Sequence, residues 1–104
     1  MTDKNINVKD AELLQMYRNK LFEIDKELIL LFGERIELTN KIGKVKFNNN
    51  LDIEQSEFWS ESSAFRKKTS EQINLSTGYI EELFAIIRKE SIRNQILEVS
   101  KDDK

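Results

Sequence analysis

The chain has 104 residues, of which 38% are hydrophobic, and its 17 basic and 19 acidic residues give a formal net charge of -2. This composition fits one small soluble domain, and the lack of a basic excess argues against a nucleic-acid partner. Cysteine and histidine are absent, which excludes disulfides, thiolate nucleophiles, histidine bases and the common zinc or iron sites, so we expect no metal and no cofactor. No apolar run approaches the ~18 residues of a membrane span, and no signal-peptide pattern opens the sequence. With three glycines and no proline, we expect a cytoplasmic all-α protein that does not bind a membrane.

The region from about Asp10 to Phe47 is predicted to form one very long helix. Its stripe positions recur at alternating spacings of three and four residues, and all but one are apolar. We call these positions the seam: Leu14, Tyr17, Leu21, Ile24, Leu28, Leu31, Arg35, Leu38, Ile42 and Val45. A helix of about forty residues is roughly 60 Å long, about twice the width of a compact domain of this size. One chain cannot cover this stripe, so the length predicts a homodimer in which a second long helix covers it.

Three consecutive asparagines at positions 48–50 are expected to end this helix. Asparagine tolerates turn and left-handed conformations, so a loop is predicted here. Asp52 followed by Gln55 has the spacing of a capping box, which predicts that a second helix begins at Ile53. The second helix carries few apolar residues, which makes its burial the hardest to predict.

A third helix is predicted from about Gly78 into Leu97, with Ser76 or Thr77 as its cap. Its stripe consists of Ile80, Phe84, Ile87, Ser91 and Gln95, the last two of which are polar.

The two ends of the chain are expected to lie outside the folded part. Residues 1–8 are polar and aperiodic, which predicts a flexible arm, and residues 99–104 are predicted to form a polar tail. Residues 9–98 would then form one domain of three helices.

Several charged and polar residues interrupt or flank the apolar stripes. Arg35 lies in the seam itself, and Arg18 and Lys46 lie in the heptad column beside it. An unpaired buried cation costs on the order of several kcal/mol, so a seam arginine should meet an anion, either an acidic side chain or a ligand. Taken singly, Arg35 is explained by a salt bridge within the helix pair. Ser91 and Gln95 are explained by interhelical hydrogen bonds, and the two flanking cations by solvation.

Taken together, these residues indicate a binding site. Arg35 and Lys46 lie three turns apart on nearly the same helix face, whereas Arg18 is about 25 Å from Arg35 along the axis. If two such helices pair antiparallel, Arg18 of one subunit can reach the site of the other. A shared pocket lined by cations and neutral donors suits a small dicarboxylate, because guanidinium groups bind carboxylates through paired hydrogen bonds.

Two segments of the chain resemble a known protein family. The segment LLQMYRNKLFEIDKELILLFGERIELTNKIGKVK is similar to the long first helix of the all-helical class of chorismate mutases, the chorismate mutase type II family. The spacing of four residues carries this likeness: Arg18, Asp25, Arg35 and Lys46. The segment YIEELFAIIRKESIRNQ is similar to the last helix of that family, which ends in S-x-x-x-Q.

The resemblance implies an intertwined homodimer with two shared active sites that rearrange chorismate to prephenate. This reaction is unimolecular and pericyclic, so it requires no nucleophile, metal or proton shuttle. By the same resemblance, Arg35 and Arg18 of the partner subunit would hold the two carboxylates of the substrate. Lys46 and Gln95 would contact the ether oxygen, and Ser91 would assist in the pocket.

The second helix departs from the family pattern. Family members carry an acidic residue and, three positions later, an Arg-Glu pair whose glutamate contacts the ring hydroxyl, and this chain has no such pair there. An ungapped register places Phe58 and Trp59 at those positions. Glu57 is the candidate partner for the ring substituent, with Glu54 and Gln55 as alternatives.

Three kinds of function stay open from the sequence. The favoured one is a chorismate mutase, and a second is the use of a chorismate relative. That relative would be 4-amino-4-deoxychorismate, whose amine favours a nearby carboxylate, or isochorismate, which family members cleave to salicylate and pyruvate. The third is a helical dimer that binds a partner without catalysis. We favour an enzyme, because a decayed site would lose its buried cations first, and Arg18, Arg35 and Lys46 are all present.

Overall fold

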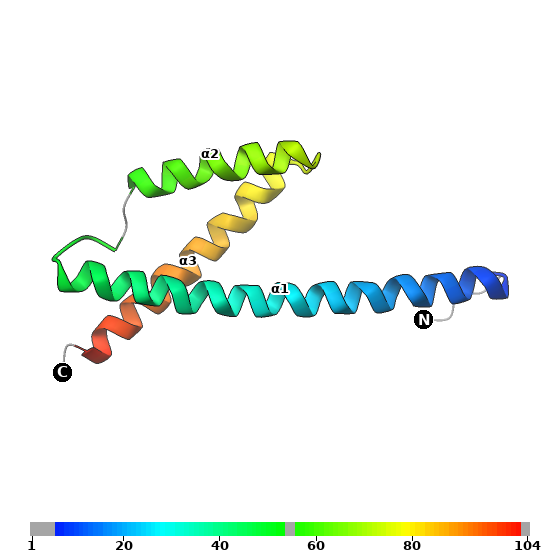
Figure 1. The fold of residues 1–104 in the computed structure, drawn as a ribbon, viewed down its shortest axis with the longest axis horizontal. Coiled ribbons are helices and arrows are strands. Elements are labelled where there is room, and N and C mark those ends of the chain that lie inside the picture. The colour runs from blue at the N-terminus through cyan, green and yellow to red at the C-terminus, as the bar shows by residue number, and fades with distance from the viewer. Residues whose placement is uncertain (1–5, 54–55, 103–104) are drawn as a thin grey trace. The chain divides into compact units, whose positions relative to one another are not determined.

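A computed structural model describes residues 6–53 and 56–102 of the chain. Its described residues form three helices and no strand, namely α1 (Val8–Asn48), α2 (Ser56–Gln72) and α3 (Thr77–Asp102) (Figure 1). The prediction of an all-α fold with three helices and a very long first helix is confirmed. None of these helices combines the length and apolarity that a membrane crossing needs.

The chain divides into two compact units, residues 1–35 and residues 36–104. Within the described residues, the first unit consists mainly of α1 up to Arg35. The helix starts at a local cap, because the Asn7 side-chain oxygen accepts the Asp10 backbone N–H at 2.9 Å and the Asn7 amide donates to the Asp10 carboxylate at 3.0 Å. Residues 1–5, most of the predicted N-terminal arm, lie outside the described residues.

The apolar seam of α1 is exposed in the single chain. Apart from half-buried Leu14 and Arg35, every seam residue is exposed, from 38% at Ile42 to 60% at Val45. Across the described residues, no hydrophobic side chain reaches full burial. A single copy therefore has no apolar core of its own around α1.

α1 and α2 end in the same way, each through an asparagine in the left-handed conformation. The φ angles are 55° at Asn50 and 58° at Asn74. After α1, the Leu51 backbone N–H donates to the Lys46 carbonyl at 2.8 Å, and the equivalent bond after α2 measures 2.9 Å. These six-to-one hydrogen bonds are Schellman motifs, in which asparagine takes the place of the more usual glycine. The predicted break at the three asparagines is confirmed.

The start of α2 differs from the prediction. The helix begins at Ser56, and Ile53, where the sequence predicted its start, lies in a bend. The Ile53 carbonyl accepts a hydrogen bond from the Lys46 ammonium at 2.8 Å, across the loop, and this bond holds Ile53 outside the helix. Gln55, the second half of the expected capping box, lies outside the described residues.

α3 begins as predicted but ends later. Ser76 caps it, since its hydroxyl oxygen accepts the Tyr79 backbone N–H at 3.4 Å. At the other end the helix continues to Asp102, so residues 99–102 of the predicted polar tail are helical. A pair three residues apart, Lys101 with Glu98 at 3.2 Å, lies in this last stretch and suits a helix end.

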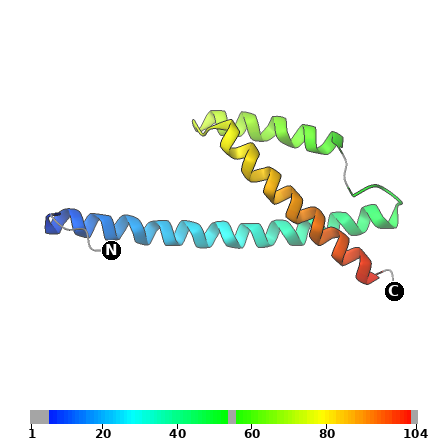
Figure 2. The same cartoon turned by 180° about the vertical axis from the view of Figure 1, so that it is seen from behind.

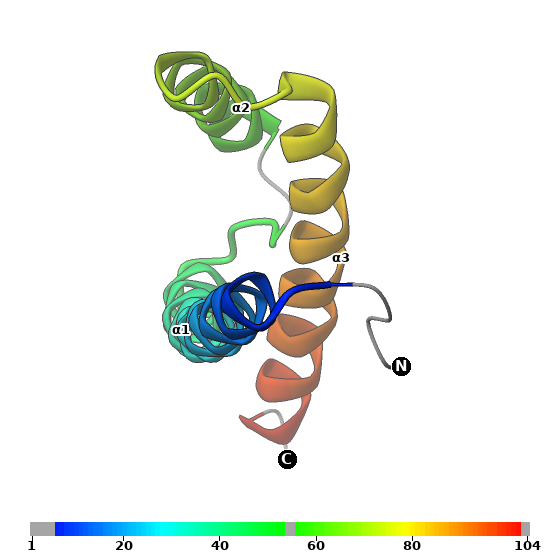
Figure 3. The same ribbon diagram turned by 90° about the vertical axis from the view of Figure 1, so that its right-hand side faces the viewer.

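Within the second unit, α3 turns back from the end of α2 and crosses the last turns of α1, residues 36–48 (Figures 1 and 2). Figure 3 shows the same crossing from the side. α3 thus has two packing partners. Its N-terminal half lies against α2, and its C-terminal half lies against the end of α1.

Candidate functional site

The crossing of α1 and α3 is centred on Gly43 and Gln95. A Cβ atom added at buried Gly43 would lie 3.0 Å from the Gln95 Cγ and 3.1 Å from its Cβ, so the missing side chain allows the close approach. Gln95 is 5% exposed, and its Nε2 donates to the Thr39 backbone carbonyl at 2.7 Å. The amide is therefore fixed on α1, and it forms the interhelical hydrogen bond that the structural alternative predicted.

Lys46 follows Gly43 by three residues, on nearly the same side of α1 as Thr39. Its side chain is half-buried, and its ammonium donates to the Ile53 carbonyl at 2.8 Å. Burial lowers the pKa of Lys46 below the 10.5 of an ordinary lysine, because the charged form loses hydration. Over the described ranges, no acidic side chain pairs with it, so its charge is held by a neutral acceptor.

Ser91 lies one turn before Gln95 on α3 and is 5% exposed. Its hydroxyl donates to the Ile87 carbonyl at 3.0 Å, a bond within the same helix. The second unit therefore brings three of the predicted site residues, Lys46, Ser91 and Gln95, to the α1–α3 crossing and the turn of α3 next to it.

The other predicted site residues are placed elsewhere along the chain. Arg18 is exposed and Arg35 half-buried, and both lie on the part of α1 that belongs to the first unit. Glu57 is in the first turn of α2, but its side chain lies outside the part that the structure describes, as does all of Glu54. The roles of these four residues stay predictions.

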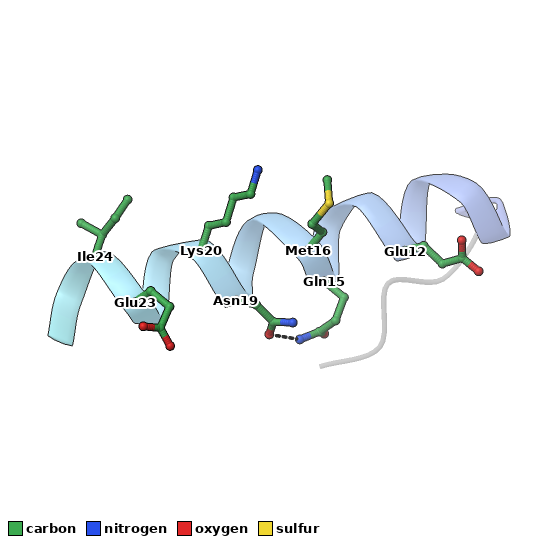
Figure 4. A pocket seen from close by; sticks show the side chains of 7 residues that line it. All are labelled: Glu12, Gln15, Met16, Asn19, Lys20, Glu23 and Ile24. Atoms are coloured by element: carbon green, nitrogen blue, oxygen red, sulfur yellow. Dashed lines mark hydrogen bonds between the residues drawn. The ribbon is translucent and has the colours of Figure 1, made fainter. Parts of the chain in front are cut away.

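A hollow of about 750 Å³ lies along the N-terminal part of α1 (Figure 4). It is lined by Glu12, Gln15, Met16, Asn19, Lys20, Glu23 and Ile24. All seven residues come from one helix, and the hydrogen bond drawn between Gln15 and Asn19, at 2.9 Å, is also local. A hollow with a single helical wall cannot enclose a ligand, and it contains none of the predicted site residues.

A second hollow, of about 530 Å³, adjoins the crossing in the second unit. It is lined by the end of α1, the following loop and α3, through Phe47, Leu51, Asp52, Ile53, Ile92 and Ile96. The loop that borders it also holds the Lys46 ammonium, through the Ile53 carbonyl.

A buried cation that no sequence pattern above predicts lies between α2 and α3. Arg66 is 7% exposed, and its Nε donates to the Glu81 carboxylate at 3.2 Å. The Arg66 guanidinium carbon lies 4.4 Å from the centre of the Trp59 ring and 4.8 Å from that of Phe84. The Ser63 hydroxyl donates to Glu81 at 3.0 Å, and these two hydrogen bonds, led by that from Arg66, lower the pKa of Glu81. We call these five residues the α2–α3 cluster.

A signal for this cluster was present in the sequence. Trp59, Ser63, Arg66 and Ser70 recur at spacings of four, three and four, the pattern of a helix face that packs against a neighbour. The face is mostly polar, so a search for apolar stripes passes over it. The buried side chains on it are Arg66 and Ser70.

Comparison with known proteins agrees with the resemblance seen in the sequence. The sequence profile of the chorismate mutase type II family matches residues 17–96. The T-protein of Haemophilus influenzae is 32% identical over 84 residues, which are 81% of this chain and 22% of that protein. A bifunctional chorismate mutase/prephenate dehydratase of Buchnera aphidicola (subsp. Acyrthosiphon pisum) is 34% identical over 85 residues, which are 79% of this chain and 21% of that protein. No solved structure matches the chain significantly.

The chain spans about a fifth of the length of these curated relatives. The region that the family profile matches includes the α1–α3 crossing, with Lys46, Ser91 and Gln95. It covers well over half of the sequence, and the chain therefore belongs to the chorismate mutase type II family.

Proposed function

We propose that the chain is a chorismate mutase, which converts chorismate to prephenate. The α1–α3 crossing carries this proposal, because it sets two hydrogen-bond donors on facing helices, the Lys46 ammonium and the Gln95 amide. Both donors are at least half-buried, where hydrogen bonds to a developing negative charge are strong. The relative from Buchnera aphidicola, a bifunctional chorismate mutase/prephenate dehydratase, supports the same activity.

The proposed reaction needs only positioning and charge stabilisation. One C–O bond of the substrate breaks while a C–C bond forms within the same molecule, so atoms and electrons balance without a co-reactant. Negative charge grows on the ether oxygen as the bond breaks, and Lys46 and Gln95 donate hydrogen bonds to it. Arg35 and Arg18 of the partner subunit bind the two carboxylates and hold the folded conformer in which the reacting carbons meet.

A homodimer is part of this proposal. The exposed seam of α1 leaves residues such as Leu21, Leu38 and Val45 more than half exposed, and a second copy of α1 would bury them. Sedimentation equilibrium at assay concentration should give twice the chain mass of 12.3 kDa. A monomer that turns over substrate at full rate would overturn the shared-site arrangement.

A substrate panel tests the activity. We expect chorismate to yield prephenate, as identified by mass spectrometry and by acid conversion of the product to phenylpyruvate. Salicylate and pyruvate from isochorismate would instead indicate a lyase, and selective turnover of 4-amino-4-deoxychorismate would indicate the amino substrate. If a folded protein converts none of the three, the enzymatic proposal is wrong and a non-catalytic binding module is favoured.

Mixing two inactive variants tests the shared pocket. Arg18→Ala and Arg35→Ala should each abolish most turnover while helical content stays intact. In an equal mixture after subunit exchange, half of the dimers are mixed, and each has one complete site, so about a quarter of the wild-type activity should return. Differently tagged chains can show that the subunits have exchanged. If turnover does not return despite exchange, either one subunit supplies both arginines to its own site or neither arginine belongs to the site.

A further inference from the structure

α3 passes from one packing partner to the other between Arg88 and Gln95. The Arg88 guanidinium carbon lies 4.7 Å from the centre of the Trp59 ring on α2, whereas Gln95 is bonded to Thr39 on α1. Seven residues are nearly two full turns, so Arg88 and Gln95 lie on the same face of α3, about 10 Å apart along its axis. Ser91, at 5% exposure, lies between them on that face. A ligand bound at the crossing and extending along α3 would meet Arg88 next.

Trp59 gives Arg88 a fixed position. The same indole ring contacts the guanidinium of Arg66, at 4.4 Å, and Arg66 is buried and paired with Glu81. The α2–α3 cluster therefore holds the ring in place, and the ring in turn orients Arg88 through a cation–π contact.

The two arginines at this ring differ in their charge partners. Arg66 has a carboxylate partner, so its charge is compensated within the chain. For Arg88 the described part of the chain provides the Trp59 ring and no acidic partner. An aromatic face attracts a cation but does not neutralise it, so a half-buried guanidinium in this setting still favours an anion.

We infer that Arg88 is a further substrate-binding residue, which binds a carboxylate of the dicarboxylate substrate from the α2 side of the site. This inference rests on the proposed function, because it places the substrate's ether oxygen at Gln95. The roughly 10 Å between the two positions is a span that both side chains and one small dicarboxylate can bridge. Trp59 acts through Arg88 as a positioning residue.

The test compares Arg88→Gln and Arg88→Lys with a control, Arg93→Gln. Arg93 is an exposed arginine of the same helix that pairs with Glu90 at 2.6 Å. We expect Arg88→Gln to raise KM for chorismate about 10- to 100-fold with a smaller change in kcat, as the loss of a charge-assisted hydrogen bond predicts. Arg88→Lys should raise KM by about 5-fold, since lysine keeps the charge but lacks the paired N–H donors with which a guanidinium binds a carboxylate. The control should match the wild type.

Binding is measured separately through fluorescence, because Trp59 is the single tryptophan of the chain. Chorismate should change the wild-type emission in a saturable way, with a weaker half-saturation in both Arg88 variants. If the wild type converts chorismate and Arg88→Gln shows an unchanged KM, Arg88 is not a ligand, while the proposed function stands.

If the wild type does not convert chorismate, the titration decides. Saturable binding that weakens in the Arg88 variants would support Arg88 as an anion-binding residue even though the mutase reaction is absent. Emission that responds to chorismate in none of the proteins would overturn both the Arg88 inference and the proposed function. If Arg88→Gln loses its helical circular dichroism, Arg88→Lys replaces it, and an unchanged KM in Arg88→Lys overturns the inference.

Discussion

The packing regions at the two halves of α3 differ in how a cation is held. At the N-terminal half, Arg66 is buried with its own carboxylate, Glu81, and the pair is complete within the chain. At the C-terminal half, which packs against the end of α1, Lys46 of α1 is half-buried against a neutral carbonyl, that of Ile53. Burial of a cation is favourable only when an anion accompanies it. The first region therefore pairs its cation within the chain, whereas under the proposed function the second would offer its charge to the anionic substrate.

Removing the charge at the second region should have the largest effect. In Lys46→Met we expect kcat to fall about 10²- to 10³-fold, because one donor to the developing oxyanion is lost. Helical circular dichroism and the thermal midpoint should change little, since no ion pair within the described residues is broken. Lys41→Met, an exposed lysine of the same helix, serves as the control and should keep wild-type kinetics. If kcat falls equally in Lys46→Met and Lys41→Met, the loss is not specific to the Lys46 region and the comparison between the two regions fails.

The same lysine should set the alkaline limit of activity. Its pKa is lowered by burial, so the ammonium loses its proton at a pH below 10.5, and kcat should fall as pH rises through that lowered value. The stability of the fold should change in the opposite direction and increase with pH over this range. Between the lowered folded pKa and the unfolded value the unfolded chain binds more protons, so the free energy of unfolding rises with pH.

A carboxyl at the amide position should reverse the pH dependence. Gln95→Glu should lose most activity near neutral pH, where an ionised carboxylate repels the developing negative charge. Activity should rise as pH falls and the carboxyl becomes a donor, provided that the wild type is measured over the same range. A flat profile would mean that position 95 does not face the ether oxygen.

A methyl group at the crossing should have a smaller effect on the same region. Gly43→Ala places a Cβ 3.0 Å from the Gln95 Cγ, so the glutamine must shift by a few tenths of an ångström, and we expect kcat to fall about 10-fold. Gly33→Ala is the matched control, because its added Cβ meets nothing within 4 Å. It should raise the free energy of unfolding by about 0.5–1 kcal/mol through helix propensity alone. If Gly43→Ala keeps the wild-type kcat, the close contact between Gly43 and Gln95 does not affect catalysis.

Loss of the Arg66–Glu81 pair should lower the stability of the fold and leave turnover almost unchanged. Arg66 lowers the pKa of Glu81, so the pair stabilises the fold above the unfolded pKa near 4.5 and loses this contribution as pH falls through the lowered folded value. Glu81→Gln should therefore lower the thermal midpoint at neutral pH and flatten its decline in acid, with kcat little changed. Thermal melts between pH 2 and 7 measure this, and a loss of kcat as large as that of Lys46→Met would remove the distinction between the regions.

Local patterns in the sequence predicted most of the fold. The spacing of the seam gave the length of α1, and the three asparagines marked its end, because both depend on residues close together in the chain. The start of α2 was predicted wrongly, since the bond from Lys46 to Ile53 spans the loop and no propensity encodes it. The helical residues 99–102 were missed because a polar composition is compatible with both a tail and a helix end.

The candidate site residues were predicted from polar residues in or beside the apolar stripes, and their roles stay predictions. Ser91 and Gln95 stood out within the stripe of α3 and Lys46 stood out beside the seam of α1, and all three lie in the second unit, at or near the α1–α3 crossing. The burial of Arg66 was not predicted, because it depends on which face of α2 packs against α3, a long-range contact. The proposed pocket includes Arg18 of a second chain, and the pattern of one chain predicts such a partner only through the length of its apolar seam.

Lys46 takes part both in ending α1 and in fixing the loop that follows it. The Lys46 carbonyl accepts the Leu51 N–H that terminates the helix, and the Lys46 ammonium reaches two residues further, to the Ile53 carbonyl. An insertion or deletion between Lys46 and Leu51 would disrupt both hydrogen bonds at once. Under the proposed function, the length of this loop is constrained together with catalysis, and homologues should vary in the residues of this loop more readily than in their number.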